Sequence, residues 1–449
     1  MTEPAARVLL VNEMVARLRS GALDAFAARA AELEAADLAD VLSALDDDER
    51  VIAVQTLPPE VSSQALIEMP EEEHPGETLA ALEPEQAAEI VERLADDDAA
   101  DILGNLEPAE QERILAEVED AGRADVEKLL VYDTESAGGL MTTRVVTVPD
   151  TATVSEALDE IRRQSEEMED FYEVFVTDAR RRLAGVLPFK SVAINPPTRP
   201  VREIMQPADI RVGPEEDQEQ VARLMARYNL ASIPVTDDNG RLLGAVTFDD
   251  VTDVVEAETT EDILKFGGVS PSEELGGTWR SAVRSRLPWL YVNLLTAFAA
   301  ATVVMIFSNA IQALKWLAIF MPVIAGMGGN TGTQALAVTV RRLALGQVQS
   351  GEGGGLVGKE VLVGLTNGVA IALIAGAAGW IAAGPAFGVV VFSAMTGNLM
   401  VAGFAGAFVP LLLEKLRIDP AIASSIFVTT FTDMCGFFLL LGLATRFLL

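Results

Sequence analysis

The sequence predicts a multidomain protein in which an all-α N-terminal solenoid and a tandem α/β unit precede a linker helix and a five-helix transmembrane domain. Three observations support this fold class. Short apolar segments recur at roughly 12-residue intervals up to residue 131, which indicates stacked helices. A β-α-β-β-α pattern then occurs twice between residues 138 and 258, and long, almost uncharged apolar runs follow residue 281.

The N-terminal segment, residues 1–131, carries a proline or an acidic residue where one helix ends and the next begins. Pro58, Pro70, Pro84 and Pro108 each stand just after an apolar segment, which is the position that starts a new helix. A solenoid of this kind offers an interaction or sensor surface. A spacer with no binding role is the alternative.

The tandem unit comprises a first copy at residues 138–200 and a second at 201–258. In the first copy we expect strands at 145–148, 173–177 and 183–187 and a helix at 154–163. In the second we expect strands at 210–212, 232–236 and 242–246 and helices at 218–228 and 249–257. Equivalent hairpin turns fall at 178–182 and 237–240. The last helix continues toward residue 266, so that residues 259–280 form a linker helix region to the membrane domain at 281–449.

Charge is distributed very unevenly along the chain. The net charge is −34, yet residues 281–449 contain five acidic and nine basic residues, which leaves 62 acidic and 24 basic residues in 1–280. Such an acidic surface repels nucleic acid and attracts cations. Within 249–261, carboxylates fall at i,i+3 and i,i+4, which destabilises a helix unless cations lie there. A solvated acidic face is the alternative.

One cysteine, Cys435, and one histidine, His74, exclude a disulfide scaffold and argue against a Cys/His zinc or copper site. The N-terminus lacks the pattern of a signal peptide, so we expect the N-terminal half on the cytoplasmic side.

Five apolar runs are each long enough to span a membrane: Leu287–Ser308, Leu314–Val340, Val361–Ala383, Phe387–Leu413 and Ala421–Phe447. Basic residues gather before the first run, between the second and third, and between the fourth and fifth. The positive-inside rule therefore places the N-terminus in the cytoplasm and the C-terminus outside. Five spans are few for a pore within one subunit, which favours a pore shared by a homodimer.

Asp433 lies at the centre of a stretch of 23 otherwise uncharged residues, Ala421–Leu443. An ionisable group at mid-membrane costs a few kcal/mol or more, so it normally faces a polar interior, a partner or an ion path. We favour an ion path. A protonated carboxyl group hydrogen-bonded between helices is the alternative.

The second span is rich in glycine and amides from Gly326 to Gln334 and follows Pro322. Irregular backbone at membrane depth is tolerated only where it is buried or lines a watery cavity, although such glycines also serve simple helix packing. Together with Asp433 and the Thr429 hydroxyl, this stretch offers oxygen ligands of the kind that Mg²⁺ prefers.

Several motifs together resemble the MgtE family of magnesium channels. They are Pro322-Val-x-x-Gly326-x-Gly-Gly-Asn-x-Gly-x-Gln334, Lys359-Glu360-x-x-x-Gly364-x-x-Asn367-Gly368, Asp419-Pro420-Ala421 with Thr430-x-x-Asp433, and Gly138-Gly-Leu-Met-Thr142. The tandem unit resembles a pair of cystathionine-β-synthase (CBS) domains. Gly244-Ala-Val-Thr247-Phe-Asp-Asp250 matches that family's G-x-x-T-x-x-D element, whereas Pro188 and Ser191 replace its Thr and Asp in the first copy.

The resemblance implies a homodimer whose pore is formed by the second and fifth spans. It implies Mg²⁺ near Asp433 and the backbone carbonyls of Gly326, Gly329 and Thr429. It also implies regulatory Mg²⁺ sites on the acidic half, whose ligands fall on Asp97, Asp98, Asp101, Asp217, Glu219, Asp250, Asp253, Glu258 and Glu261. In the second CBS domain, Thr247 and Asp250 are candidate residues for binding ATP. Asn229, Thr333 and the pair Ser425-Ile426 depart from the family's pattern.

The function predicted is a Mg²⁺-selective channel of the inner membrane that takes up Mg²⁺ and is closed by cytosolic Mg²⁺ bound at acidic domain interfaces. An ion-coupled secondary transporter of divalent cations and a membrane-anchored ligand sensor are the alternatives. An enzyme is disfavoured because no nucleophile, base and orienting group converge in the motifs. The sequence does not decide four points: whether the protein is a channel or a carrier, whether it selects Mg²⁺ over Co²⁺ and Mn²⁺, whether ATP binds, and how many regulatory sites there are.

Overall fold

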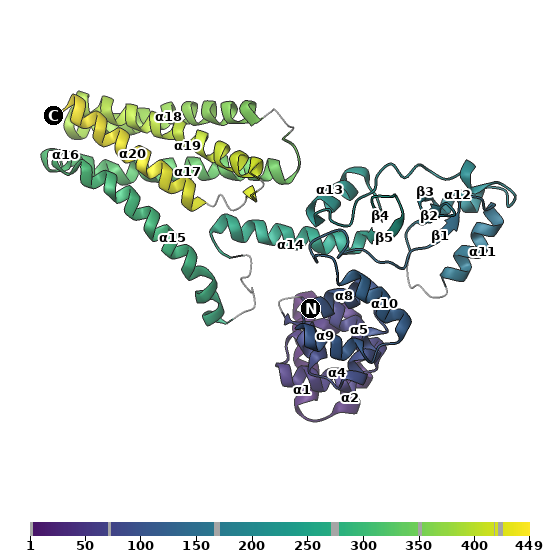
Figure 1. Ribbon diagram of the computed structural model, residues 1–449. Helices are drawn as coiled ribbons and strands as arrows, with labels where there is room; N and C mark the ends of the chain where they lie inside the picture. The colour runs from purple at the N-terminus through teal and green to yellow at the C-terminus, as the bar shows by residue number, and fades with distance from the viewer. Residues whose placement is uncertain are drawn as a thin grey trace. The chain divides into compact units, whose positions relative to one another are not determined.

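The computed structural model describes residues 3–70, 73–165, 171–270, 278–348, 353–416, 418–420 and 425–449. The chain divides into two compact units, residues 1–256 and 257–449 (Figure 1). The first unit contains the helical N-terminal domain and the tandem α/β unit. The second contains the end of the linker helix and a bundle of long helices.

Short helices form the N-terminal domain, as predicted. They are α1 (Glu3–Arg19), α2 (Leu23–Ala30), α3 (Ala35–Ser43), α4 (Asp47–Thr56), α5 (Pro59–Ile67), α6 (Pro75–Ala80), α7 (Pro84–Val91), α8 (Asp96–Gly104), α9 (Pro108–Leu115) and α10 (Asp120–Leu129). Helices α3, α5, α7 and α9 contact one another in sequence, and so do α2, α4, α6, α8 and α10. The domain is therefore a two-row solenoid with a continuous apolar core between the rows.

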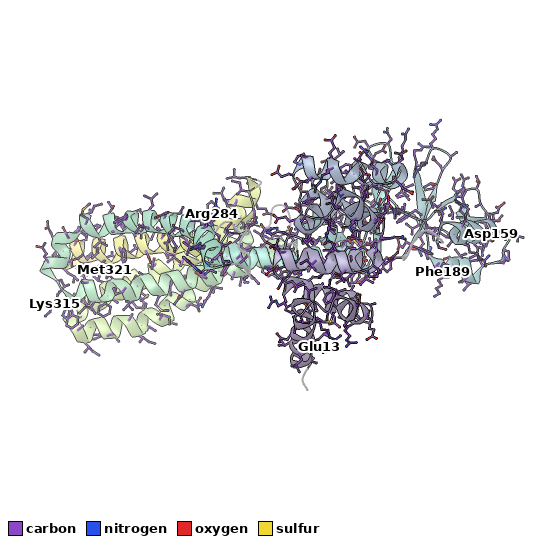
Figure 2. The ribbon with its side chains drawn as sticks, turned by 90° about the horizontal axis from the view of Figure 1, so that it is seen from below. Glu13, Asp159, Phe189, Arg284, Lys315 and Met321 are labelled. Carbon is purple, nitrogen blue, oxygen red and sulfur yellow. The ribbon has the colours of Figure 1, made fainter. Side chains whose placement is uncertain are left out.

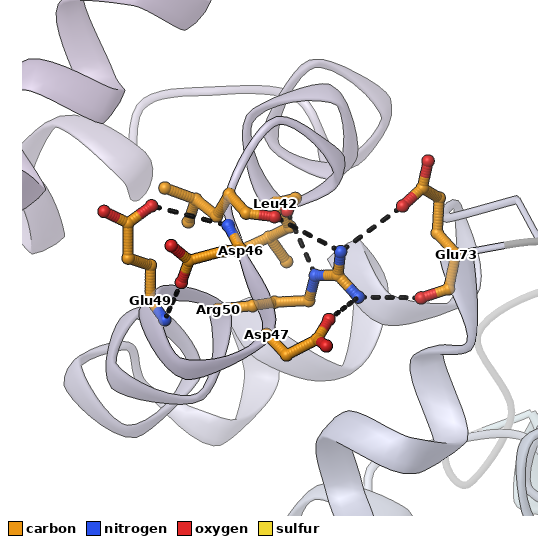
Figure 3. Close-up of polar contacts among 7 residues, drawn as sticks. Leu42, Asp46, Asp47, Glu49, Arg50 and Glu73 are labelled. Carbon is orange, nitrogen blue, oxygen red and sulfur yellow. Dashed lines mark hydrogen bonds and ion pairs between the residues drawn. The ribbon is translucent and has the colours of Figure 1, made fainter. Parts of the chain in front are cut away.

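Polar contacts around Arg50 join neighbouring turns of this solenoid (Figure 3). The Arg50 side chain is buried, and its guanidinium donates to the Leu42 carbonyl at 3.1 Å and to the Glu73 carbonyl at 2.7 Å. Asp46 and Glu49 form a capping box at the start of α4. A buried guanidinium needs such partners, and here they connect α3, α4 and the segment before α6.

The tandem α/β unit has the predicted order of elements. They are β1 (Thr147–Pro149), α11 (Val154–Gln164), β2 (Val174–Thr177), β3 (Leu183–Leu187) and α12 (Phe189–Ile194), then a 3₁₀ turn at Val201–Glu203, α13 (Gln218–Tyr228), β4 (Ser232–Thr236) and β5 (Leu242–Thr247). β1 pairs with β2 in parallel, whereas β2–β3 and β4–β5 are antiparallel hairpins. The strand predicted at 210–212 is reduced to a single parallel bridge between Val212 and Val235.

Helix α14 (Phe248–Gly267) follows β5 directly and runs for 20 residues without interruption. The predicted last helix of the tandem unit and the start of the linker therefore form one helix. Val251 and Val254 are buried on it. Residues 271–277 of the predicted linker region, 259–280, lie outside the described residues.

The second unit contains α15 (Trp279–Ile306), α16 (Ser308–Ala313), α17 (Trp316–Ala344), α18 (Gly353–Ala383), α19 (Pro385–Lys415) and α20 (Ser425–Phe447). α18 packs along α19, and α17 contacts both α19 and α20. α15 diverges from the bundle and contacts α20 (Figure 1). Arg284 and Lys315 lie at opposite ends of the long-helix bundle (Figure 2).

Four helices in the described ranges are long and apolar enough to cross a membrane: α15, α18, α19 and Ile426–Phe447 of α20. α17 has 29 residues but contains the polar, glycine-rich stretch from Gly326 to Gln334. Its crossing of the membrane, and with it the count of five spans, stays a prediction. Residues 421–424, the predicted start of the fifth span, lie outside the described residues.

Candidate metal sites

The two helices that carry the predicted pore residues, α17 and α20, lie side by side and pack through glycines of α17 (Figure 1). A Cβ atom at Gly329 would lie 3.2 Å from Thr429 Cγ2, and one at Gly332 would lie 2.6 Å from Val428 Cγ1. α17 is one continuous helix over this stretch, so its glycines provide close approach rather than unwinding. The structure thus brings the predicted residues Gly329 and Thr429 together.

Asp433 lies four residues beyond Thr429 on α20, and both are half-buried. Residues four apart share a helix face, so this carboxylate and this hydroxyl belong to the same side of α20. Gly326 differs, because it is exposed and its Cβ direction meets no described atom within 4 Å. Within one chain, Gly326 therefore does not pack against the other predicted pore residues in the described part of the structure.

An exposed polar stripe runs along α17. Gly326, Asn330 and Gln334 are all exposed and follow one another at four-residue intervals, so they share one face of the helix. Ile324 and Leu336, among others, are buried elsewhere around the same helix. An amide exposed to hydrocarbon is unfavourable, which makes this stripe suitable for water, an ion or a second protein surface.

Asn398 on α19 is a polar residue that sequence reasoning missed. Its side chain is fully buried, and Nδ2 donates to the Ile324 carbonyl of α17 at 3.0 Å. A Cβ atom at Gly328 or Gly436 would lie 2.3 or 2.7 Å from that nitrogen, so two glycines make room for this amide. The sequence did contain a signal for this residue, because Asn398 is the single amide side chain in the apolar run 387–413. A polar side chain within an apolar span normally has a polar partner, which is the rule that singled out Asp433.

The C-terminal end of α14 contacts the bundle at the ends of α17 and α20. Lys265 forms ion pairs with Glu261 one turn earlier and with Asp419 in the segment between α19 and α20. Phe266 packs in one apolar cluster with Leu336 of α17 and Val428 of α20. The linker helix therefore ends against the two helices that carry the predicted pore residues.

An acidic group forms where the start of α8 meets the start of α14. Asp97 is buried, and its Oδ1 atom has no hydrogen-bond partner among the described residues. Burial, followed by the charge of Asp250, raises the Asp97 pKa well above its usual range. The same two causes raise the pKa of Asp98 to about 7. Burial raises the pKa of Asp250 to about 6, although a hydrogen bond from Thr247 opposes it. Three predicted regulatory residues therefore lie together as a like-charged group.

The remaining predicted ligands outside α14 are Asp101, Asp217 and Glu219. Asp101 lies one turn beyond Asp97 on α8 and is half-buried. Asp217 caps α13 by accepting a hydrogen bond from the Glu219 backbone N–H at 3.0 Å. Glu219 in turn forms an ion pair with Arg223 at 3.4 Å. Helix capping and intrahelical pairing account for this pair of acids without a metal.

The other predicted ligands follow α14. Asp253 is exposed, whereas Glu258 and Glu261 are half-buried, and Glu261 is paired with Lys265. Across the described part of the chain, no three His, Cys, Asp or Glu side chains converge in the manner of a preformed metal site.

Thr247 and Asp250 lie next to each other in the second α/β repeat. The Thr247 hydroxyl donates to Asp250 Oδ2 at 2.5 Å. Both side chains are half-buried at the junction of β5 and α14. The predicted nucleotide pair is thus adjacent, and it shares Asp250 with the acidic group.

Comparison with known families matches these domains in the order that the structure has them. The family model described as the MgtE intracellular N domain matches residues 33–135, the CBS domain model matches 137–193 and 201–257, and the model described as a divalent cation transporter matches 321–443. The magnesium transporter MgtE of Thermus thermophilus is 38% identical over 329 residues, 72% of each chain. This chain belongs to the MgtE family. Its Enterococcus faecalis relative, also a magnesium transporter MgtE, is 34% identical over 74% of this chain and 72% of that one.

Two solved structures are each similar to about half of this MgtE family member. The cytosolic domain of the Mg²⁺ channel MgtE in complex with ATP has a TM-score of 0.51 and 36% identity, covering 54% of this chain and 99% of that one. The soluble part of a magnesium transporter has a TM-score of 0.50 and 26% identity, covering 56% and 99%. The predicted fold class of helical N-terminal domain, tandem CBS domains and C-terminal helical domain is therefore confirmed.

Proposed function

We propose that this protein is a Mg²⁺-selective channel that takes up Mg²⁺ across the inner membrane and is closed by cytosolic Mg²⁺. Family membership and the names of its relatives support Mg²⁺ as the transported ion. The observation that carries the gating proposal is the course of α14. This helix begins beside the acidic group around Asp250, and Phe266 near its end packs against Leu336 of α17 and Val428 of α20.

The proposed permeation path lies along α17 and α20 in a homodimer. Asp433 supplies the only charge of the stretch Ala421–Leu443, and backbone carbonyls near Gly326, Gly329 and Thr429 supply neutral oxygens. Mg²⁺ gives up its water reluctantly, so one carboxylate with retained water suits it better than a closed protein cage. The polar stripe of α17 supports a second copy of the chain, because a dimer turns an exposed face into a shared pore lining.

The proposed sensor works through carboxylate repulsion. Two carboxylates about 5 Å apart repel by roughly 3 kcal/mol at an effective dielectric constant of 20. A few such pairs exceed the few kcal/mol that separate two conformations in a typical switch. At low cytosolic Mg²⁺, bare acids drive the domains apart and release α14. At high Mg²⁺, bridged acids draw together, and the end of α14 holds the pore closed.

Open probability against cytosolic Mg²⁺, measured in membrane patches, tests this gating scheme. Neutralising Asp250, Glu258 and Glu261 together to Asn or Gln is expected to move closure to higher Mg²⁺ and to leave single-channel conductance unchanged. Deleting residues 1–131 is expected to weaken closure as well, because one side of the acidic group is removed. Closure of both variants at the wild-type Mg²⁺ concentration would mean that these acids are only a solvated surface.

A nucleotide in the second CBS domain is a second candidate ligand. The related cytosolic domain in complex with ATP and the adjacent Thr247–Asp250 pair favour it. Equilibrium dialysis of the full-length protein with ATP, repeated with Thr247→Val, tests the site. Equal ATP binding by both proteins would contradict it.

A further inference from the structure

Asp96, the first residue of α8, differs from the two acids that follow it. Its carboxylate is fully buried and accepts three hydrogen bonds from Thr142 and Thr143, which lie 46 and 47 positions further along the chain. Oδ1 accepts from the Thr142 hydroxyl at 2.7 Å. Oδ2 accepts from the Thr143 backbone N–H at 2.9 Å and from the Thr143 hydroxyl. Buried charges are tolerated when they are satisfied in this way, and bonds to an ionised acceptor are the strong ones.

The partners of Asp96 connect it to the other half of the acidic group. Thr142 exchanges two backbone hydrogen bonds with Ala245 of β5, both at 3.0 Å. Gly244 permits this contact, because a Cβ atom there would lie 2.3 Å from the Thr142 carbonyl oxygen. β5 ends at Thr247, which bonds to Asp250 at the start of α14. A short chain of contacts therefore runs from the start of α8 to the start of α14.

We propose that Asp96 is a positioning residue that holds the start of α8 against Thr142 and Thr143, so that Asp97 and Asp98 face Asp250. Asp96 is not itself a metal ligand in this scheme, because both of its oxygens are engaged by protein donors. Its bonds lead to a distant segment, which separates this role from general stabilisation of a helix N-terminus. The inference rests on the proposed function of the acidic group as the Mg²⁺ sensor.

Asp96→Asn in the full-length protein, reconstituted in liposomes, tests the proposal. The variant loses the charge and has one acceptor oxygen in place of two, so it cannot accept from both Thr142 and Thr143. We expect the cytosolic Mg²⁺ concentration for half-closure to rise about tenfold, with flux at zero cytosolic Mg²⁺ within about twofold of wild type. Thr143→Val, which keeps the backbone donor, is expected to give a smaller shift in the same direction. It also keeps the proposal testable if Asp96→Asn fails to fold.

Two controls separate positioning from stability. Asp120→Asn changes an exposed aspartate at the same position of α10 and is expected to leave the half-closing Mg²⁺ concentration unchanged. Phe26→Leu trims a fully buried side chain of α2 and is expected to lower the thermal midpoint without changing that concentration.

Amide hydrogen exchange of the same proteins supplies a readout independent of flux. In wild type at a Mg²⁺ concentration that closes the channel, the Thr143 amide is expected to be protected, and Asp96→Asn is expected to remove this protection. Wild-type closure and wild-type protection of Asp96→Asn would overturn the positioning role and leave the sensor standing. A wild-type protein that Mg²⁺ never closes would overturn the sensor and the positioning role together.

Discussion

The Lys265 ammonium group pairs with the Asp419 carboxylate, 154 residues further along the chain. Lys265 also pairs with Glu261, and its side chain is only 16% exposed. Two carboxylates thus meet one cation where the end of α14 lies against the bundle. The pairing fixes that end of the helix next to the helices that carry Thr429 and Gly329.

Replacing Lys265 by Met is expected to weaken this anchor, because the aliphatic stem remains and the charge is lost. A partly buried pair contributes about 1 kcal/mol, so the half-closing Mg²⁺ concentration should rise by roughly fivefold. Lys415→Met, an exposed lysine of the same unit, is the matched control. Patch recordings of both variants check the effect, and equal closure by the two would show that the ion pair carries no gating energy.

Asp433→Asn is expected to leave a folded dimer that transports almost no Mg²⁺, because the central charge of its span is lost while the side-chain volume is kept. Mg²⁺ uptake by cells that depend on this transporter checks it, with membrane expression matched by immunoblot. Uptake at the wild-type rate would remove Asp433 from the permeation path.

The glycines of α17 predict a graded series. Gly328→Ala brings a Cβ atom 2.3 Å from the Asn398 amide, so we expect a loss of about 1–3 kcal/mol in stability. Gly326→Ala meets open space and removes a flexible residue from a helix, so we expect no loss. Gly329→Val crowds Thr429 and should reduce flux. Thermal survival of the detergent-purified protein ranks the variants, and equal midpoints for the two alanine variants would contradict the packing of α17.

The acidic group predicts a pH dependence. Asp98, with a pKa of about 7, and Asp250, with a pKa of about 6, titrate well above the ordinary aspartate value of 3.8. The groups that face them are Asp249, Asp96, Glu68 and Asp253. Because the folded protein binds protons that the unfolded chain has lost, its metal-free stability falls as pH rises from about 4 to 7. Below about pH 7, Mg²⁺ must displace these protons in order to bind.

We therefore expect the half-closing Mg²⁺ concentration to be about tenfold lower at pH 8 than at pH 6. Asp98→Asn should flatten this dependence, whereas Glu68→Gln should leave most of it. Mg²⁺ titrations of channel closure at the two pH values supply the test. A half-closing concentration that is independent of pH would mean that the acids stay ionised throughout.

Sequence periodicity predicted most of the fold, because the spacing of apolar residues within a segment indicates both its secondary structure and the face that it buries. The solenoid follows from prolines and apolar faces recurring along residues 1–131, and the CBS pair from two matched strand and helix patterns. A full strand was predicted at 210–212, but there Val212 alone forms a bridge, which is parallel and pairs it with Val235. Residues 421–424 and 271–277 lie outside the described residues, so the predictions there stand as made.

The site could be predicted only in part. A lone charge in an apolar run marked Asp433, and a local acid density marked Asp250. Three features depend on contacts between distant segments: the buried Asp97 oxygen that has no hydrogen-bond partner within the described ranges, the three hydrogen bonds of Asp96, and the Lys265–Asp419 pair. Sequence spacing cannot distinguish a solvated acid from a buried one, because burial is set by tertiary packing.

Single-channel current through the full-length protein in a planar bilayer, with Mg²⁺ changed on one side at a time, tests the central claim most directly. Raising Mg²⁺ on the side of the N-terminal domain is expected to close the channel at unchanged unitary conductance. Raising it on the opposite side is expected to increase inward current. Mg²⁺ current whose open probability is the same at every concentration on the N-terminal side would contradict the account.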